Sequence, residues 1–261
     1  MKSITSRDNP QYKELKLFAT SSQARRKAGR TLLDGVHLCE AYFQHLGRPE
    51  ICVVSESASE DREVRALLIA CEKQAVLCIS LPDILYETIS QVENGVGIMF
   101  LIVTPTLSIP SNVIETSVAL DNLQDPGNLG SILRSAAAAG VKNVFCSPGT
   151  VLAWSPKVMR AGMGAHFLLN IFENVDLVKF LQDASIPVLA TSSHTTKTIY
   201  QSNLSQPVVW LFGHEGQGVS DKLMALASET VTIPQQAAIE SLNVAASAAI
   251  CFFEQVRQQL T

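Results

Sequence analysis

A glycine-rich loop with an embedded carboxylate is the clearest candidate for chemistry in this sequence. In LFGHEGQGVS (211–220), Gly213, Gly216 and Gly218 surround Glu215. Three glycines leave bare backbone amides that can approach a flat ligand such as adenine. A plain strand-to-helix turn rarely needs three glycines and a carboxylate, so this pattern favours a binding loop.

Two further segments carry polar side chains at the start of predicted helices. DNLQDPGNLGSILRSAAAAG (121–140) contains Asn128 at the end of a D-P-G-N turn and Arg134 within the helix. Helical side chains lean towards the helix N-terminus, so the Arg134 guanidinium can return to the preceding loop. The segment IESLNVAASAAICFFE has Ser241 and Asn243 at the mouth of an apolar helix. Taken singly, helix capping by Asn128, Ser241 or Asn243 is the simpler explanation of these residues.

The elements around these segments indicate an α/β fold. After residue 115, short β-rich runs alternate with helical runs. Strands are predicted at 116–121, 143–146, 186–191, 208–213 and 230–234, and helices at 128–140, 156–162, 220–228 and 243–259. This alternation is typical of a mostly parallel sheet covered on both faces. Ligands of such sheets bind beyond the carboxyl ends of the strands, and all three polar segments fall there.

The chain divides at a Pro- and Ser-containing stretch, TPTLSIPSNVIET. Before it we expect strands and helices in a small α/β domain. Strands are predicted at 51–55, 75–80 and 97–103, and helices at 35–46 and 60–73. The predicted domains are therefore 1–104 and 116–261, joined by a linker at 105–115.

Composition excludes several classes of protein. The chain has 261 residues, of which 47% are hydrophobic, so it can bury a sizeable core and is not wholly disordered. It has no apolar run of the roughly 20 residues that a membrane span needs, and no secretory signal at its start. Its six cysteines form no C-x-x-C pair and His214 has no second ligand nearby, so neither a metal site nor a disulfide framework is predicted. We expect a soluble cytoplasmic protein.

The charges are unevenly distributed. Residues 1–30 carry eight basic and two acidic side chains, a balance of +6, although the whole chain has a net charge of −4. The rest of the chain therefore carries −10. A basic arm on an acidic body is expected where one surface meets phosphates. We expect that deleting residues 1–30 would weaken binding of a phosphate-bearing partner and leave the other functions of the chain intact.

Together the three segments resemble the motifs of the SpoU/TrmH family of S-adenosylmethionine-dependent RNA 2′-O-ribose methyltransferases. The pattern N-x-x-x-x-x-N-x-G-x-x-x-R ends at Arg134, F-G-H-E-G-x-G surrounds Glu215, and I-P is followed by E-S-L-N-V-A. SPKVMRAGMGAHF (155–167) is similar to the segment that the family carries between its first and second motifs. Residues 1–104, including AGRTLLDGVHLCEA, resemble the ribosomal-protein-like substrate-binding domain of many members.

The resemblance implies a trefoil-knotted C-terminal domain and a homodimer in which the first-motif Arg crosses to the partner's cofactor. By position, the S-adenosylmethionine site would be lined by Gly213, Ile233 and Leu242. The polar reaction centre would comprise Asn128, Arg134, Glu215, Ser241 and Asn243. One departure is Gln235 and Ala237, where the family usually has Met and Gly. An alanine there could stiffen the loop and alter cofactor affinity.

The implied reaction is methyl transfer from S-adenosylmethionine to a ribose 2′-hydroxyl in RNA. A guanidinium stays protonated at ordinary pH, so we expect Arg134 to clamp a phosphate and stabilise negative charge rather than act as a base. Because the front domain resembles ribosomal-protein RNA binders, the resemblance favours large-subunit ribosomal RNA as substrate over tRNA. The alternatives are a tRNA 2′-O-methyltransferase and an RNA-binding protein that kept the knot without the chemistry. A dinucleotide-dependent oxidoreductase is less favoured, because the strands lack a G-x-G-x-x-G fingerprint.

Overall fold

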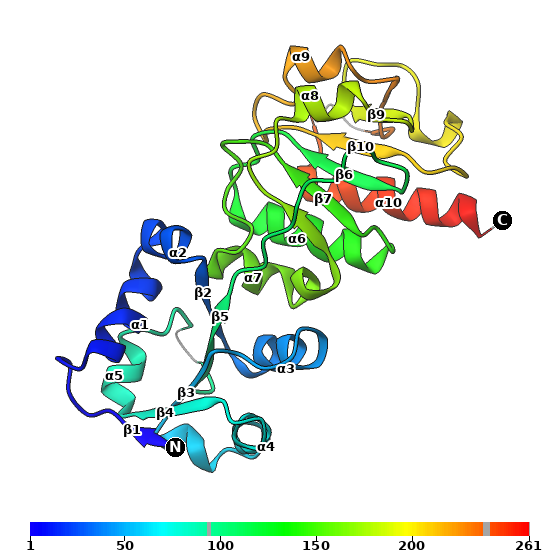
Figure 1. Cartoon of the computed structure of the whole chain (residues 1–261). Coiled ribbons are helices and arrows are strands. Elements are labelled where there is room, and N and C mark those ends of the chain that lie inside the picture. The colour runs from blue at the N-terminus through cyan, green and yellow to red at the C-terminus, as the bar shows by residue number, and fades with distance from the viewer. Residues whose placement is uncertain (93–94, 237–240, 261) are drawn as a thin grey trace. The chain divides into compact units, whose positions relative to one another are not determined.

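The computed structural model describes residues 1–92, 95–236 and 241–260, and the chain forms two compact units. Unit 1 comprises Met1–Pro105 together with Trp154–Phe167. Unit 2 comprises Thr106–Ala153 and Leu168–Thr261. Figure 1 shows the elements of both units along the chain. No helix in the described part of the chain is long and apolar enough to span a membrane.

Unit 1 is built on a mixed five-stranded sheet. In spatial order its strands are β1 (Lys2–Ser3), β4 (Leu77–Leu81), β3 (Ile51–Ser55), β5 (Ile98–Val103) and β2 (Arg30–Asp34). β1, β4 and β3 are parallel, whereas β5 runs antiparallel to both of its neighbours. Its helices are α1 (Pro10–Thr20), α2 (Ser22–Ala28), α3 (Val36–His45), η1 (Ser57–Glu60), α4 (Arg62–Lys73), α5 (Asp83–Glu87), α7 (Pro156–Gly162) and η2 (Ala165–Leu168). All predicted strands and helices of the front region are present, with ends shifted by one or two residues.

Residues 1–30 are part of the folded unit and not an appended arm. β1 pairs with β4, and Tyr12, Leu15 and Phe18 of α1 are buried in the same core as Val53 and Leu101 of the sheet. Deleting residues 1–30 would therefore remove an edge strand and several core side chains. The deletion would therefore disturb the fold of unit 1 as well as its charge, while the expectation that S-adenosylmethionine binding and dimerisation survive it stays a prediction.

Unit 2 contains a six-stranded sheet that is parallel throughout, as the alternation of strands and helices predicts. Its spatial order is β11 (Glu229–Val231), β9 (Val188–Thr191), β10 (Val209–Phe212), β6 (Ser117–Leu120), β7 (Asn143–Cys146) and β8 (Asn170–Phe172). The helices are α6 (Pro126–Ala138), α8 (Leu177–Gln182), η3 (Ile199–Gln201), α9 (Asp221–Met224) and α10 (Val244–Gln259). β8 and α8 were not predicted from the sequence.

Both faces of the unit 2 sheet are covered (Figure 1). On one face, Leu181 of α8 and Leu223 of α9 share a core with Phe145 and Leu211. On the other, Phe252 of α10 meets Phe212 edge-on, with ring centroids 5.8 Å apart. Burial on two sides explains why these strands are continuous apolar runs and not alternating patterns.

The segment Trp154–Phe167 packs with unit 1, although its position in the sequence lies within the predicted domain 116–261. The Thr31 hydroxyl donates to the Trp154 carbonyl at 3.0 Å, and Phe167 meets Tyr42 edge-on at 5.5 Å. These contacts hold the segment to β2 and α3, so unit 2 is not one continuous stretch. The predicted linker, 105–115, contains no helix or strand.

Candidate active site

The first and second motif segments leave the sheet side by side. β6 ends at Leu120 and β10 at Phe212, and these two residues are register partners in neighbouring parallel strands. The Asp121 carboxylate then accepts a hydrogen bond from the backbone N–H of Ser220 at 3.0 Å. Residues that follow one strand therefore hold residues that follow the other, at the carboxyl edge where ligands of such sheets bind.

Glu215 fastens the glycine-rich loop to the first motif segment. Its carboxylate accepts hydrogen bonds from the backbone N–H groups of Asp125 at 2.9 Å and Gln124 at 3.1 Å. It also accepts from the Asn128 side-chain amide at 3.1 Å. One carboxylate thus fixes both the backbone of the turn and the rotamer of Asn128.

Asn243 continues this series of hydrogen bonds into the third motif segment. Its side-chain amide donates to the Asn128 side-chain oxygen at 2.9 Å. Its own side-chain oxygen caps α10 by accepting from the N–H groups of Ala245 at 2.9 Å and Ala246 at 3.2 Å. Asn243 is therefore a helix cap and a member of the polar cluster at once, so capping and chemistry are not alternatives here. Three predicted site residues, Glu215, Asn128 and Asn243, form one hydrogen-bonded chain.

The Glu215 carboxyl is held in its charged form. Partial burial alone would raise its pKa, but the hydrogen bonds donated by the Asp125 backbone, the Asn128 side chain and the Gln124 backbone outweigh that effect. Its pKa therefore lies below the ordinary value. An ionised carboxylate only accepts hydrogen bonds. Glu215 therefore holds the Asn128 amide nitrogen towards itself, which leaves the Asn128 amide oxygen facing Asn243.

Arg134 and Ser241 are not part of this hydrogen-bonded series. Both side chains are exposed, and among the described residues neither makes a hydrogen bond or ion pair with the cluster. Arg134 is six positions after Asn128, which places it about 9 Å further along the helix and about 120° around it. The expectation that the Arg134 guanidinium returns to its own loop stays a prediction, because no hydrogen bond or ion pair among the described residues ties it there.

The cap of α6 also differs from the prediction. Asp125, not Asn128, is the N-cap, and its side chain accepts from the Asn128 backbone N–H at 2.7 Å. Pro126 occupies the first turn, where its missing N–H costs nothing. Asn128 is thereby free to use its side chain in the cluster. Asp121 and Asp125 are site-building residues that sequence reasoning missed, although an Asp directly after a predicted strand and one before Pro-Gly were visible signals.

The glycine-rich loop is closed by its own backbone. His214 and Gly218 exchange two backbone hydrogen bonds of 2.9 and 2.8 Å. This closure brings Gly213 so near Gly218 that a Cβ at Gly213 would lie 2.1 Å from the Gly218 carbonyl carbon. Only glycine fits at Gly213. The His214 Nδ1 accepts from the Gly216 N–H at 2.9 Å, so this ring supports the loop. The described residues contain no group of three or more side chains suited to holding a metal ion.

The predicted cofactor residues lie at the ends of these segments. Gly213 follows β10 and is buried, while Ile233 and Leu242 are half-buried before and after the part of the third segment outside the described residues. Backbone groups beside half-buried aliphatic side chains suit an adenine ring, so the donor set fits S-adenosylmethionine. Gln235 is exposed, and Ala237 lies outside the described residues.

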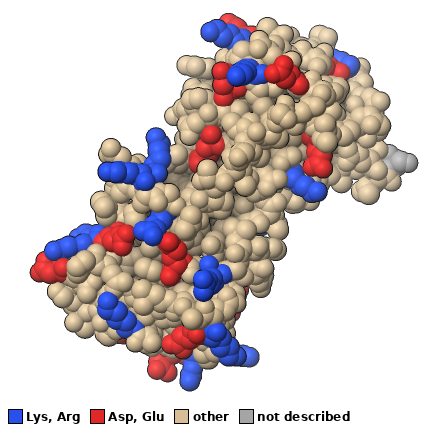
Figure 2. Space-filling view, viewed as in Figure 1, with Lys and Arg blue, Asp and Glu red and all other residues tan. Residues whose placement is uncertain are grey.

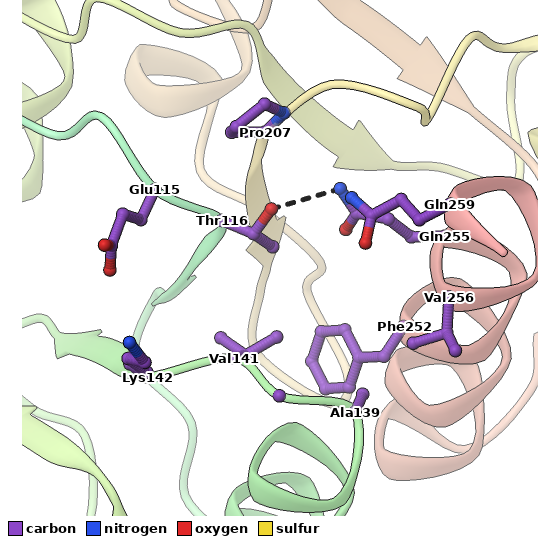
Figure 3. Close-up of a pocket in the computed structure, with 11 residues that line it drawn as sticks. Glu115, Thr116, Ala139, Val141, Lys142, Pro207, Phe252, Gln255, Val256 and Gln259 are labelled. Atoms are coloured by element: carbon purple, nitrogen blue, oxygen red, sulfur yellow. Dashed lines mark hydrogen bonds between the residues drawn. The ribbon is translucent and has the colours of Figure 1, made fainter.

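A hollow of about 250 Å³ occurs elsewhere in unit 2 (Figure 3). Its lining includes Thr116, Val141 and Phe252, and the Gln255 amide donates to the Thr116 hydroxyl at 3.1 Å. Thr116 and Val141 precede β6 and β7, so this hollow lies at the amino edge of the sheet. The polar cluster lies at the opposite, carboxyl edge, and the hollow is not part of it.

The three motif segments match those of a known protein family. A model of the SpoU rRNA Methylase family matches residues 115–253, more than half of the chain and all three motif segments. The chain belongs to this family. It is 32% identical to a protein of Synechocystis named as an uncharacterized tRNA/rRNA methyltransferase, over 98% of this chain and 94% of that protein.

Other relatives of this SpoU family member have more specific names. A Bacillus subtilis protein, the 23S rRNA (guanosine(2553)-2′-O)-methyltransferase RlmP, is 26% identical over 97% of this chain and 98% of its own length. The crystal structure of an AdoMet-bound rRNA methyltransferase from Sinorhizobium meliloti superposes with a TM-score of 0.86 at 26% identity, covering 100% of this chain and 99% of that one. The SpoU protein described here is accordingly an RNA 2′-O-methyltransferase with S-adenosylmethionine as its methyl donor.

Proposed function

We propose that this protein methylates a ribose 2′-hydroxyl in large-subunit ribosomal RNA. The observation that carries the proposal is the hydrogen-bonded chain Glu215–Asn128–Asn243, which joins all three motif segments at the carboxyl edge of the unit 2 sheet. The Bacillus subtilis relative, which acts on 23S rRNA and matches nearly end to end, supports this substrate over tRNA. The bacterial relative that acts on 23S rRNA also supports a cytoplasmic location.

Each site residue has a distinct task in this proposal. When bound, S-adenosylmethionine supplies an electrophilic methyl group on its sulfonium. Gly213, Ile233 and Leu242 would hold it, largely through backbone contacts. Because the methyl group is already activated, the protein must mainly align the 2′-hydroxyl. The 2′-oxygen takes the methyl group, S-adenosylhomocysteine is released, and the hydroxyl proton passes to a substrate phosphate or to water. We assign that alignment to Asn128, whose amide Glu215 fixes, to Asn243, whose amide donates to Asn128, and to the exposed Ser241 hydroxyl.

Arg134 is proposed to act on the site of a partner subunit. It is exposed and makes no hydrogen bond or ion pair with its own cluster among the described residues, which leaves its guanidinium available to a second copy. An uncovered apolar strip on α10 supports such a homodimer. Ala246, Ala249, Ile250 and Phe253 recur at helical spacing, all four are exposed or half-buried, and Phe253 is 49% exposed. α6, which carries Arg134, packs beside α10.

Two features of architecture complete the proposal. Unit 2 is proposed to contain the trefoil knot of its family, a known exception to the rule that chains do not thread loops. Unit 1, with its excess of positive charge near the N-terminus, is proposed to bind the RNA substrate. Membership of the SpoU family and the end-to-end match to rRNA methyltransferases support both.

Mapping 2′-O-methylation across total RNA tests the proposed substrate. A strain that lacks the gene should lose a 2′-O-methyl mark in large-subunit ribosomal RNA, and the wild-type gene should restore it while an Arg134→Ala gene should not. Loss of a tRNA mark with ribosomal RNA unchanged would favour the tRNA enzyme. Calorimetry that shows no binding of S-adenosylmethionine would favour the binding-only alternative.

A further inference from the structure

The N-terminal part of unit 1 contains a long stretch without acidic residues. Residues 15–33 hold five basic side chains and no Asp or Glu. Such a stretch can present uncompensated positive charge, provided that the fold does not use the charges internally. The structure shows which of the five are already in use.

Two of these basic side chains are committed to the fold. Arg25 donates to the Phe18 carbonyl at 2.5 Å, near the end of α1. Arg30 forms ion pairs with Glu14 at 3.3 Å and with Glu50 at 2.7 Å. Both are therefore poor candidates for an external ligand.

The remaining three point to solvent. Lys16, Arg26 and Lys27 are exposed, and among the described residues none makes a hydrogen bond or ion pair. Arg26 and Lys27 share one face of α2 with Gln23, at positions i, i+3 and i+4. Figure 2 shows Lys and Arg side chains over α2 with no Asp or Glu among them.

α2 is anchored at both ends, so it presents these charges rigidly. At its start, the Ser21 side chain accepts from the Ala24 N–H at 3.1 Å, and Ala24 packs against the core. At its end, Gly29 adopts φ +61°, and its carbonyl accepts from the Thr104 N–H at 2.8 Å. A fixed cationic face loses less conformational entropy on binding than a flexible tail would.

We propose that α2 is the phosphate-binding element of unit 1, and that Arg26 and Lys27 contact the backbone of the RNA substrate. The inference rests on the proposed function. A guanidinium and an ammonium on one face suit two neighbouring phosphates, and such contacts position an RNA without reading its bases. Of the eight basic side chains in residues 1–30, this proposal assigns phosphate contact to Arg26 and Lys27.

A matched pair of double variants tests this assignment. Arg26→Gln/Lys27→Gln removes two charges from α2, whereas Arg62→Gln/Arg65→Gln removes two from α4, where Asp61 and Glu63 lie between and beside them. All four positions are exposed, so both variants should fold, which thermal unfolding will check. The probe is an unmodified large-subunit ribosomal RNA transcript, titrated at a series of salt concentrations.

The α2 variant should lower the slope of log affinity against log salt by about 1.4–1.8, since each lost phosphate contact contributes roughly 0.7–0.9. The α4 variant should change it little, and calorimetry should show unchanged S-adenosylmethionine binding in both. An unchanged slope in an α2 variant that still folds, beside a wild type that binds and methylates the transcript, would overturn the α2 assignment alone. A wild type that neither binds nor methylates ribosomal RNA would overturn the proposed function and this inference with it.

Discussion

At the scale of single residues, Glu215 organises the site without having to touch the substrate. Its carboxylate receives three N–H groups, two from the backbone and one from Asn128. Glu215→Gln would turn an amide nitrogen towards at least one of these donors. We expect turnover to fall about 10- to 100-fold, because a hydrogen bond to a charged group contributes roughly 1.5–3 kcal/mol. Asp221→Asn, an exposed carboxylate on α9, is the control and should keep wild-type kcat.

We expect the ionised Glu215 carboxylate to make the stability of the folded protein depend on pH. The folded protein lowers the pKa of Glu215 below the ordinary value of 4.5. The stabilisation is therefore complete above that ordinary value and is lost as the pH falls through the lower pKa of the folded state. Wild type should have the higher Tm near neutral pH, and the difference from Glu215→Gln should narrow on acidification. A difference that stays constant across the acidic range would show that the carboxylate charge is not what holds the loops.

Gly213 gives a second residue-scale prediction. A Cβ there would lie 2.1 Å from the Gly218 carbonyl carbon, so the loop of Gly213→Ala must open. We expect a loss of stability of about 1–3 kcal/mol, the usual range for overpacking, together with loss of S-adenosylmethionine binding. Gly216→Ala is the matched control, because its nearest neighbour would be the His214 ring at 3.7 Å. Equal calorimetric affinity in the two variants would contradict the proposed role of the loop.

At the scale of elements, much of the architecture could be predicted, while the caps and contacts could not. The predicted helices at 35–46 and 60–73 and the buried strands of unit 2 were found because their apolar spacing is strong. β8 is only three residues long, Asn170–Phe172, and offers too little pattern to recognise. The D-P-G-N turn contains two good cap residues, and the choice of Asp125 over Asn128 depends on three-dimensional contacts.

The site itself was only partly predictable for the same reason. Sequence spacing placed the motifs at strand ends, which brought Asn128, Glu215 and Asn243 to one edge. The bonds between them join residues 87 and 115 positions apart, which no local pattern records. Arg134 lies in α6, close to the helix that the sequence predicts, and its role at either subunit's site stays a prediction.

We expect the apolar strip on α10 to form the contact between the two subunits of a dimer. Phe253→Glu places a charge in the proposed dimer face and should shift the protein from dimer to monomer in sedimentation velocity. Tyr200→Glu is the control, because Tyr200 on η3 is similarly exposed at 57% and lies outside the strip. An unaltered sedimentation coefficient for Phe253→Glu would contradict this interface.

At the scale of the whole molecule, we propose that two copies share each site. Arg134→Ala and Gly213→Ala should each be inactive alone. After exchange of subunits, a mixed dimer holds one intact site if Arg134 serves the partner's cofactor, so equal mixing should restore about a quarter of wild-type activity. A mixture that remains inactive, with mixed dimers shown by native mass spectrometry, would place Arg134 in its own subunit's site.

The central claim is methyl transfer to a ribose 2′-oxygen of ribosomal RNA, and the nucleoside that receives the methyl group tests it most directly. Unmodified large-subunit ribosomal RNA should be incubated with the protein and methyl-labelled S-adenosylmethionine, then digested to nucleosides and separated. We expect label in a 2′-O-methylnucleoside with wild type, and little or none with Arg134→Ala. Label on a base, or none with a wild-type protein that binds S-adenosylmethionine, would contradict it.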